Sequence, residues 1–156
     1  MGWGLSSGVI GWWPFWCAFV PWAAWLAWHD LTSRRLPDHL TLPAGAVAGL
    51  FSLYDGSSTA FALGAATWAG AYGAVGVVKH GAMGGGDVKL ALALGGATAV
   101  AAGVPGTLLA MVIAGLLTGI AGMLVREKRL PHGPSMLVAC AGVMLGGPMG
   151  LWALRT

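Results

Sequence analysis

The chain has 156 residues, of which 57% are hydrophobic and only 8% are charged, and its formal net charge is +3. A soluble domain carries about 25% charged residues, so this sequence has too little charge to cover a water-exposed surface. The small and scattered positive charge also gives no indication of nucleic-acid binding. The composition therefore predicts an all-α polytopic membrane protein whose solvent is the lipid bilayer.

Charged and turn-forming residues divide the chain into apolar runs. Residues 90–125 carry no charge and exceed the length of one span, and Gly103-Val104-Pro105-Gly106 divides them because Pro and Gly mark a turn. Residues 1–28 contain no Lys or Arg, so a cleavable signal peptide is not expected there. No repeat or second domain is evident, so residues 1–156 are expected to form one transmembrane domain. We expect about six transmembrane helices over residues 8–28, 40–54, 59–78, 88–102, 107–125 and 135–154.

The distribution of Lys and Arg predicts how these helices are oriented. Only Arg155 falls on one side of the predicted topology, whereas seven basic residues fall in the alternate turns, namely Arg34, Arg35, Lys79, Lys89, Arg126, Lys128 and Arg129. Loops rich in Lys and Arg remain in the cytoplasm. We therefore expect both termini to face outward, and Asp30, Asp38 and Asp87 to lie at the cytoplasmic surface. Asp55 falls on the opposite side and is excluded from any joint site.

Asp30 and Asp87 are the candidate catalytic residues, because each stands where a long apolar run meets a charged turn. Acids kept at a membrane helix end usually have a function, and paired carboxylates are typical of acid–base peptide hydrolysis. The two acids can meet if the first and fourth helices pack together. The preceding glycines, Gly84, Gly85 and Gly86, form an expected active-site loop where an extended substrate backbone can approach Asp87.

The same residues also permit simpler interpretations. Asp87 and Asp38 are good helix N-caps, and Asp30 can pair with Arg34 at a solvated helix end. Lys89, like Arg34 and Arg35, can simply be a positive charge that anchors the topology. The histidines leave a metal site as an alternative, although no HExxH motif is present and we predict no metal or other cofactor; they are His29, His39, His80 and His132.

Three segments stand out together: the segment from Asp30 to Asp38, Gly84-Gly85-Gly86-Asp87 with Val88-Lys89, and Leu130-Pro131-His132-Gly133-Pro134. They resemble the signatures of one family, the type IV prepilin peptidases, and the segment from Asp30 to Asp38 resembles the first of these. Gly84-Gly85-Gly86-Asp87, followed by Val88-Lys89, looks like their GxGD motif, and Lys89 belongs to it. Leu130-Pro131-His132-Gly133-Pro134 is similar to their Pro-Phe-Gly-Pro turn, with His132 at the Phe position.

This resemblance implies an intramembrane aspartyl protease in the bacterial inner membrane, whose catalytic pair is Asp30 and Asp87. Such enzymes cut the basic leader of prepilins and pseudopilins after a glycine, at the cytoplasmic membrane face. Asp38 is expected to be structural. The larger family members carry a CxxC-containing insertion that is linked to N-methylation, and this chain has no CxxC. It resembles the short forms of tight-adherence pilus systems, so only peptidase activity is expected.

Two other classes of function stay open at this point. A small ion-coupled carrier would use Asp30 and Asp87 as relay groups, although carriers usually place such acids near the bilayer midplane. A non-catalytic partner in pilus or secretion assembly would need neither carboxylate. The sequence leaves open the particular pilin substrate, the oligomeric state and the distance between the two acids.

Overall fold

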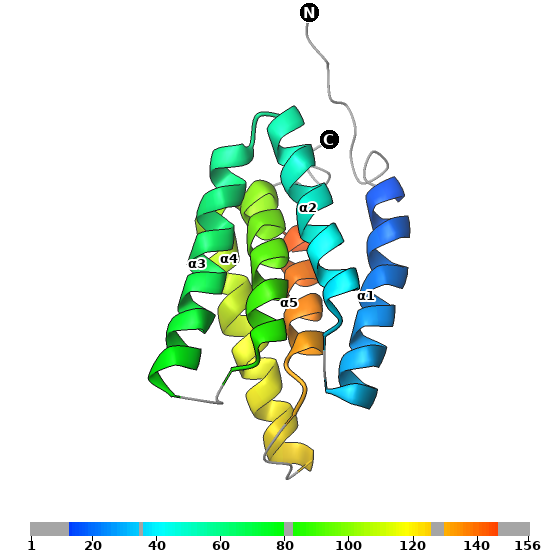
Figure 1. Ribbon diagram of the computed structural model, residues 1–156, viewed down its shortest axis with the longest axis vertical. Coiled ribbons are helices and arrows are strands. Elements are labelled where there is room, and N and C mark those ends of the chain that lie inside the picture. The colour runs from blue at the N-terminus through cyan, green and yellow to red at the C-terminus, as the bar shows by residue number, and fades with distance from the viewer. Residues whose placement is uncertain (1–12, 35, 80–82, 126–129, 147–156) are drawn as a thin grey trace, which may run out of the picture.

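The computed structural model describes residues 13–34, 36–79, 83–125 and 130–146, and the regular secondary structure of this part of the chain is helical throughout (Figure 1). Its elements confirm the predicted all-α class. They are α1 (Trp13–Ser33), α2 (Asp38–Tyr54), α3 (Ser58–Val78), α4 (Gly85–Val125) and α5 (Gly133–Gly146).

Helix α4 reverses direction at Gly103, where the backbone leaves the helical region with φ 70° and ψ 177°. Its first half rises through the bundle and its second half returns to the end where it started (Figure 1). The Thr107 hydroxyl stabilises this hairpin by donating a hydrogen bond to the Gly95 carbonyl at 3.1 Å. The predicted break at residues 103–106 is therefore confirmed, and the described chain has six helical segments.

The described residues include two helices that are long and apolar enough to cross a bilayer, α3 and α4. Large apolar side chains elsewhere also face outward, such as Val47, Leu50 and Leu53 on α2. That all six segments span the membrane, with both termini outside, stays a prediction. The predicted sixth helix begins near its expected start and continues at least to Gly146, and residues 147–154 lie outside the described part.

Helix α1 ends later than predicted, at Ser33 instead of near Trp28. The hydroxyls of Thr32 and Ser33 donate to the carbonyls of Trp28 and His29, four residues earlier, so these polar residues continue the helix. Arg34 then terminates it with a positive φ of 52°. Asp30 consequently lies in the last helical turn and not in the predicted polar loop. Residues 8–12 of the predicted helix are outside the described chain.

Neither aspartate occupies the predicted N-cap position of its helix. Helix α2 has Pro37 as its N-cap residue, with Asp38 in its first turn. Helix α4 begins at Gly85, and the amides of Asp87 and Val88 both donate to the Gly84 carbonyl. Both acids are inside helical first turns, where a negative charge is favoured by the helix dipole.

Helix α4 is the centre of the bundle, because it contacts α2, α3 and α5, whereas α1 contacts α5. Glycines allow α3 and α4 to approach closely, since a Cβ at Gly64 would overlap the Gly95 carbonyl oxygen and the Ala99 side chain. Trp68, Leu90 and Leu94 are fully buried around this contact. The predicted role of small residues in helix approach is therefore confirmed at this crossing.

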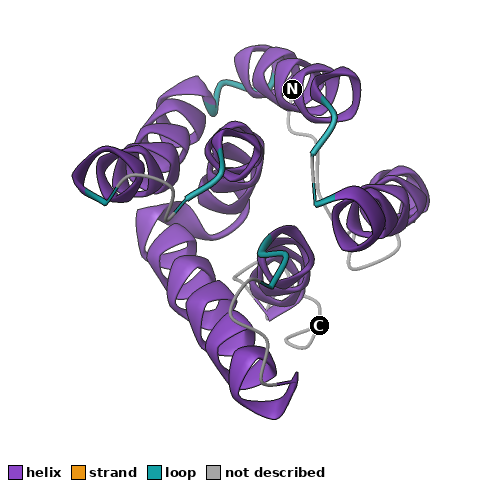
Figure 2. Ribbon diagram, turned by 60° about the horizontal axis from the view of Figure 1, so that its bottom comes forward, coloured by secondary structure: helices purple, strands orange, loops and turns teal. Residues whose placement is uncertain are grey.

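The fold gathers three chain connections at one end. The α1–α2 and α3–α4 connections and the start of α5 all lie at the lower end in Figure 1, and Figure 2 brings this end forward. The alternation of helix directions thus places Asp30 and Asp87 at the same end. Asp55, the C-cap residue of α2, lies at the opposite end, as predicted.

The close approach of α3 and α4 can be tested by mutation. We expect Gly64→Ala to lower the free energy of unfolding by about 1–3 kcal/mol, because the added methyl overlaps backbone atoms of α4. Gly70→Ala on the same helix is the matched control, since a Cβ there meets no atom within 4 Å. Thermal unfolding in detergent measures both variants, and equal melting temperatures would contradict the packing argument.

Candidate active site

Asp30 is a buried carboxylate in the last turn of α1, with only 5% of its surface exposed. Its Oδ2 atom accepts a hydrogen bond from the Gly133 amide at 3.0 Å. A Cβ at position 133 would lie 2.6 Å from the same oxygen, so the carboxylate occupies the space that a side chain would need. The start of α5 therefore supplies both the donor and the room for Asp30.

Asp87 lies partly buried in the first turn of α4, near enough to Asp30 for the two carboxylates to interact electrostatically. The predicted pair is thus brought together, although α1 packs mainly on α5. Leu36 packs between the start of α4, which carries Asp87, and the start of α5, which donates to Asp30. It is buried, and Cβ atoms at Gly86 and Gly133 would lie 2.9 and 3.4 Å from its side chain.

The three glycines before Asp87 do not form the loop that was predicted for them. Only Gly84 precedes α4, whereas Gly85, Gly86 and Lys89 are helical residues. A Cβ at Gly84 would lie 3.2 Å from Asp87 Oδ2, and the space beside Gly86 is filled by Leu36. At Gly85 a Cβ meets nothing within 4 Å. Open space beside the acid is therefore found at Gly85, while the other two glycines accommodate side chains of this protein.

Lys89 binds Asp38 and not the candidate pair. Its ammonium donates to both carboxylate oxygens of Asp38 at 2.8 Å, which joins the start of α2 to the second turn of α4. Their side chains are 42% and 57% exposed, so solvent screens the pair and it stabilises the fold by about 0–1 kcal/mol. This arrangement agrees with a structural role for Asp38.

A polar network beside the acids was missed by the sequence reasoning. His132 Nε2 lies 2.7 Å from the Tyr72 hydroxyl, and His132 Nδ1 lies 2.6 Å from the Thr118 hydroxyl. Burial lowers the pKa of His132, so its imidazole is neutral at pH 7. The sequence offered only a weak signal, because Tyr72 and Thr118 are polar residues in largely apolar helices that contain other threonines as well.

The described residues contain no group of three or more His, Cys, Asp or Glu side chains that could hold a metal ion. His29 lies in α1 and His39 in α2, while His132 is engaged with Tyr72 and Thr118. His80 is outside the described part of the chain.

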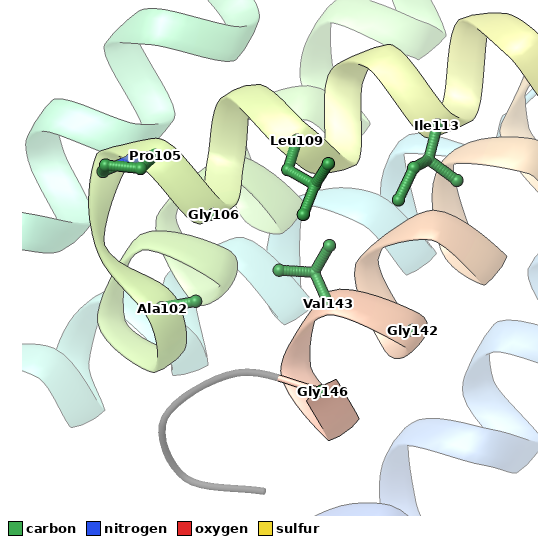
Figure 3. A pocket seen from close by; sticks show the side chains of 8 residues that line it. All are labelled: Ala102, Pro105, Gly106, Leu109, Ile113, Gly142, Val143 and Gly146. Carbon is green, nitrogen blue, oxygen red and sulfur yellow. The ribbon is translucent and has the colours of Figure 1, made fainter. Parts of the chain in front are cut away.

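A cavity of about 340 Å³ between the second half of α4 and α5 is unrelated to these acids (Figure 3). It reaches Pro105, beside the α4 reversal, and so lies toward the end of the bundle opposite Asp87. Its walls carry no polar side chain; they are formed by Ala102, Pro105, Gly106, Leu109, Ile113, Gly142, Val143 and Gly146.

The fold and the site together define an all-helical membrane protein that holds two interacting carboxylates at one end of its bundle. The model of the type IV leader peptidase family matches residues 17–123, which is more than half of the chain and includes both Asp30 and Asp87. The chain belongs to this family, as its motifs predicted. No curated protein and no solved structure matches it.

The contact between Gly133 and Asp30 gives a direct test of the site geometry. We expect Gly133→Ala to lower the free energy of unfolding by about 1–3 kcal/mol, because the methyl displaces a buried carboxylate from its donor. The ¹³Cγ resonance of Asp30 should move at the same time.

Gly142→Ala on α5 is the matched control, since a Cβ there meets no atom within 4 Å. Four aspartates make the ¹³C spectrum assignable through single Asn variants. An unchanged Asp30 resonance in a folded Gly133→Ala protein would contradict the geometry.

Proposed function

We propose that this protein is an aspartic prepilin leader peptidase in which Asp30 and Asp87 form the catalytic pair. The observation that carries the proposal is that two acids from different helices, Asp30 and Asp87, lie at one end of the bundle, where Leu36 packs against both Gly133, the donor to Asp30, and Gly86, the neighbour of Asp87. Membership of the type IV leader peptidase family supports the same reaction class.

Two carboxyl groups that repel each other tend to share one proton, which suits them to opposite roles. The ionised carboxylate takes a proton from water as the water oxygen attacks the peptide carbonyl. The protonated partner donates its proton to the carbonyl oxygen, which gives a tetrahedral diol. Collapse of the diol breaks the C–N bond, and a proton passes to the leaving amine.

The substrate fits the position of the acids. A prepilin joins a basic leader to an apolar helix, and the bond after the leader's terminal glycine lies where water meets the bilayer. The charge distribution predicts that Asp30 and Asp87 lie at this boundary, on the cytoplasmic side of the bacterial inner membrane. Gly85, where added side-chain atoms would meet open space, is the position where a substrate backbone has room beside Asp87.

The first experiment tests the catalytic pair. Purified protein in liposomes is incubated with a prepilin whose basic leader ends in glycine, and the products are identified by mass spectrometry. We expect cleavage after that glycine, and a loss of at least about 1,000-fold in Asp30→Asn and in Asp87→Asn, because an amide cannot exchange the shared proton.

Asp55→Asn, at the opposite end of the bundle, is the matched control and should cleave normally. Turnover that survives either active-site substitution would exclude the proposed pair. A folded wild-type protein that cleaves no candidate prepilin would favour a carrier or an assembly partner.

Substitution of Asp38 is expected to affect cleavage much less than substitution of Asp30 or Asp87. We expect Asp38→Asn to retain cleavage within about tenfold of wild type, because the residue is exposed and its partner Lys89 is solvated. The initial rate of leader release measures this. Loss as complete as that in Asp30→Asn, in a protein with an unchanged melting temperature, would place Asp38 in the chemistry.

A further inference from the structure

His132 joins three parts of the bundle through hydrogen bonds. Tyr72 comes from α3, Thr118 comes from the returning half of α4, and His132 itself lies in the connection immediately before α5. Both bonds are short, at 2.7 and 2.6 Å, and their members are buried or partly buried. The connection before α5 is therefore held from two sides.

The proton positions in this network follow from the other bond that Thr118 makes. The Thr118 hydroxyl donates to the Ala114 carbonyl at 3.0 Å, so its oxygen is left to accept from His132 Nδ1–H. In a neutral imidazole the other nitrogen is then an acceptor, and Tyr72 donates its hydroxyl proton to His132 Nε2. A neutral Nδ1–H tautomer satisfies every group in the network.

The residue after His132 is the donor to the candidate catalytic acid. Gly133 N–H reaches Asp30 Oδ2 at 3.0 Å, and this amide belongs to the peptide bond that joins Gly133 to His132. The network thus lies next to the donor of Asp30, and its side-chain polar atoms are occupied by one another and by the Ala114 carbonyl.

We propose that His132, held between Tyr72 and Thr118, is a positioning residue that sets the Gly133 amide against Asp30. This inference rests on the proposed peptidase function for its kinetic consequence and on the hydrogen-bond geometry for its structural one. His132 acts through Gly133 and has no contact with the scissile bond.

The kinetic test removes the partners of His132 and leaves the acids intact. We expect Thr118→Val and Tyr72→Phe each to lower kcat about tenfold, the effect of about one hydrogen bond, with KM changed less than about twofold. Thr118→Ser keeps the hydroxyl and should restore kcat. Thr67→Val is the matched control, because the Thr67 hydroxyl bonds only the Leu63 carbonyl within α3. Wild-type kcat in both network variants, or a rise in KM alone, would overturn the inference.

A spectroscopic test works without any substrate. In protein labelled with ¹⁵N-His, the His132 signals should show a protonated Nδ1 and an unprotonated Nε2. In ¹³Cγ-Asp protein, Thr118→Val should move the Asp30 resonance and leave that of Asp55 in place, while Thr118→Ser should move neither.

The two proposals fail differently. If wild type cleaves nothing, or if cleavage survives Asp30→Asn, the peptidase function fails, and the ¹³C result still decides whether His132 positions Asp30. If wild type cleaves and Asp30→Asn does not, but Thr118→Val leaves both kcat and the Asp30 resonance unchanged, the positioning role alone is wrong. An imidazolium or an Nε2–H tautomer at neutral pH would also overturn it.

Discussion

A carboxylate buried among apolar helices needs a donor at a fixed position, and in this bundle the Gly133 amide supplies one to Asp30. The first residue of α5 has to be glycine for this contact, because a side chain there would occupy the place of the carboxylate oxygen. Leu36 must lie against the same glycine and against Gly86, one residue before Asp87. Leu36 and the two glycines therefore join the segment that carries Asp87 to the segment that holds Asp30.

The reversal of α4 at Gly103 gives the site its other support. Because the second half of α4 returns beside the first, Thr118 comes back to the end of the bundle that holds Asp87. The close crossing of α3 and α4 at Gly64 and Gly95 brings Tyr72, two turns further along α3, to the same place. A helix that continued straight through residue 103 would carry Thr118 away from His132, and the network would not form.

Much of this arrangement could be predicted from charge and turn residues. The break at residues 103–106, the shared end of Asp30 and Asp87, and the exclusion of Asp55 follow from hydropathy and from the placement of Pro and Gly. Helix ends were less predictable, because they depend on local hydrogen bonds. Thr32 and Ser33 looked like turn residues but bond back to their own helix, and α4 starts within a run of glycines.

Contacts between distant segments could not be predicted from one sequence. Nothing in the spacing of Asp38 and Lys89 indicates that they pair across 51 residues, because such pairing depends on how α2 lies on α4. The same holds for Tyr72, Thr118 and His132, which are separated by up to 60 residues.

These three polar residues are best understood as one unit. Removing a single member leaves a buried donor or acceptor without a partner. Replacing all three with apolar residues leaves no such unsatisfied group among them. An aromatic ring without nitrogen at position 132, as in the motif that this turn resembles, would remove the His132 partner of Tyr72 and leave Thr118 only its bond to the Ala114 carbonyl. In this chain the histidine and its two hydroxyl partners therefore depend on one another, and the position of Gly133 depends on all three.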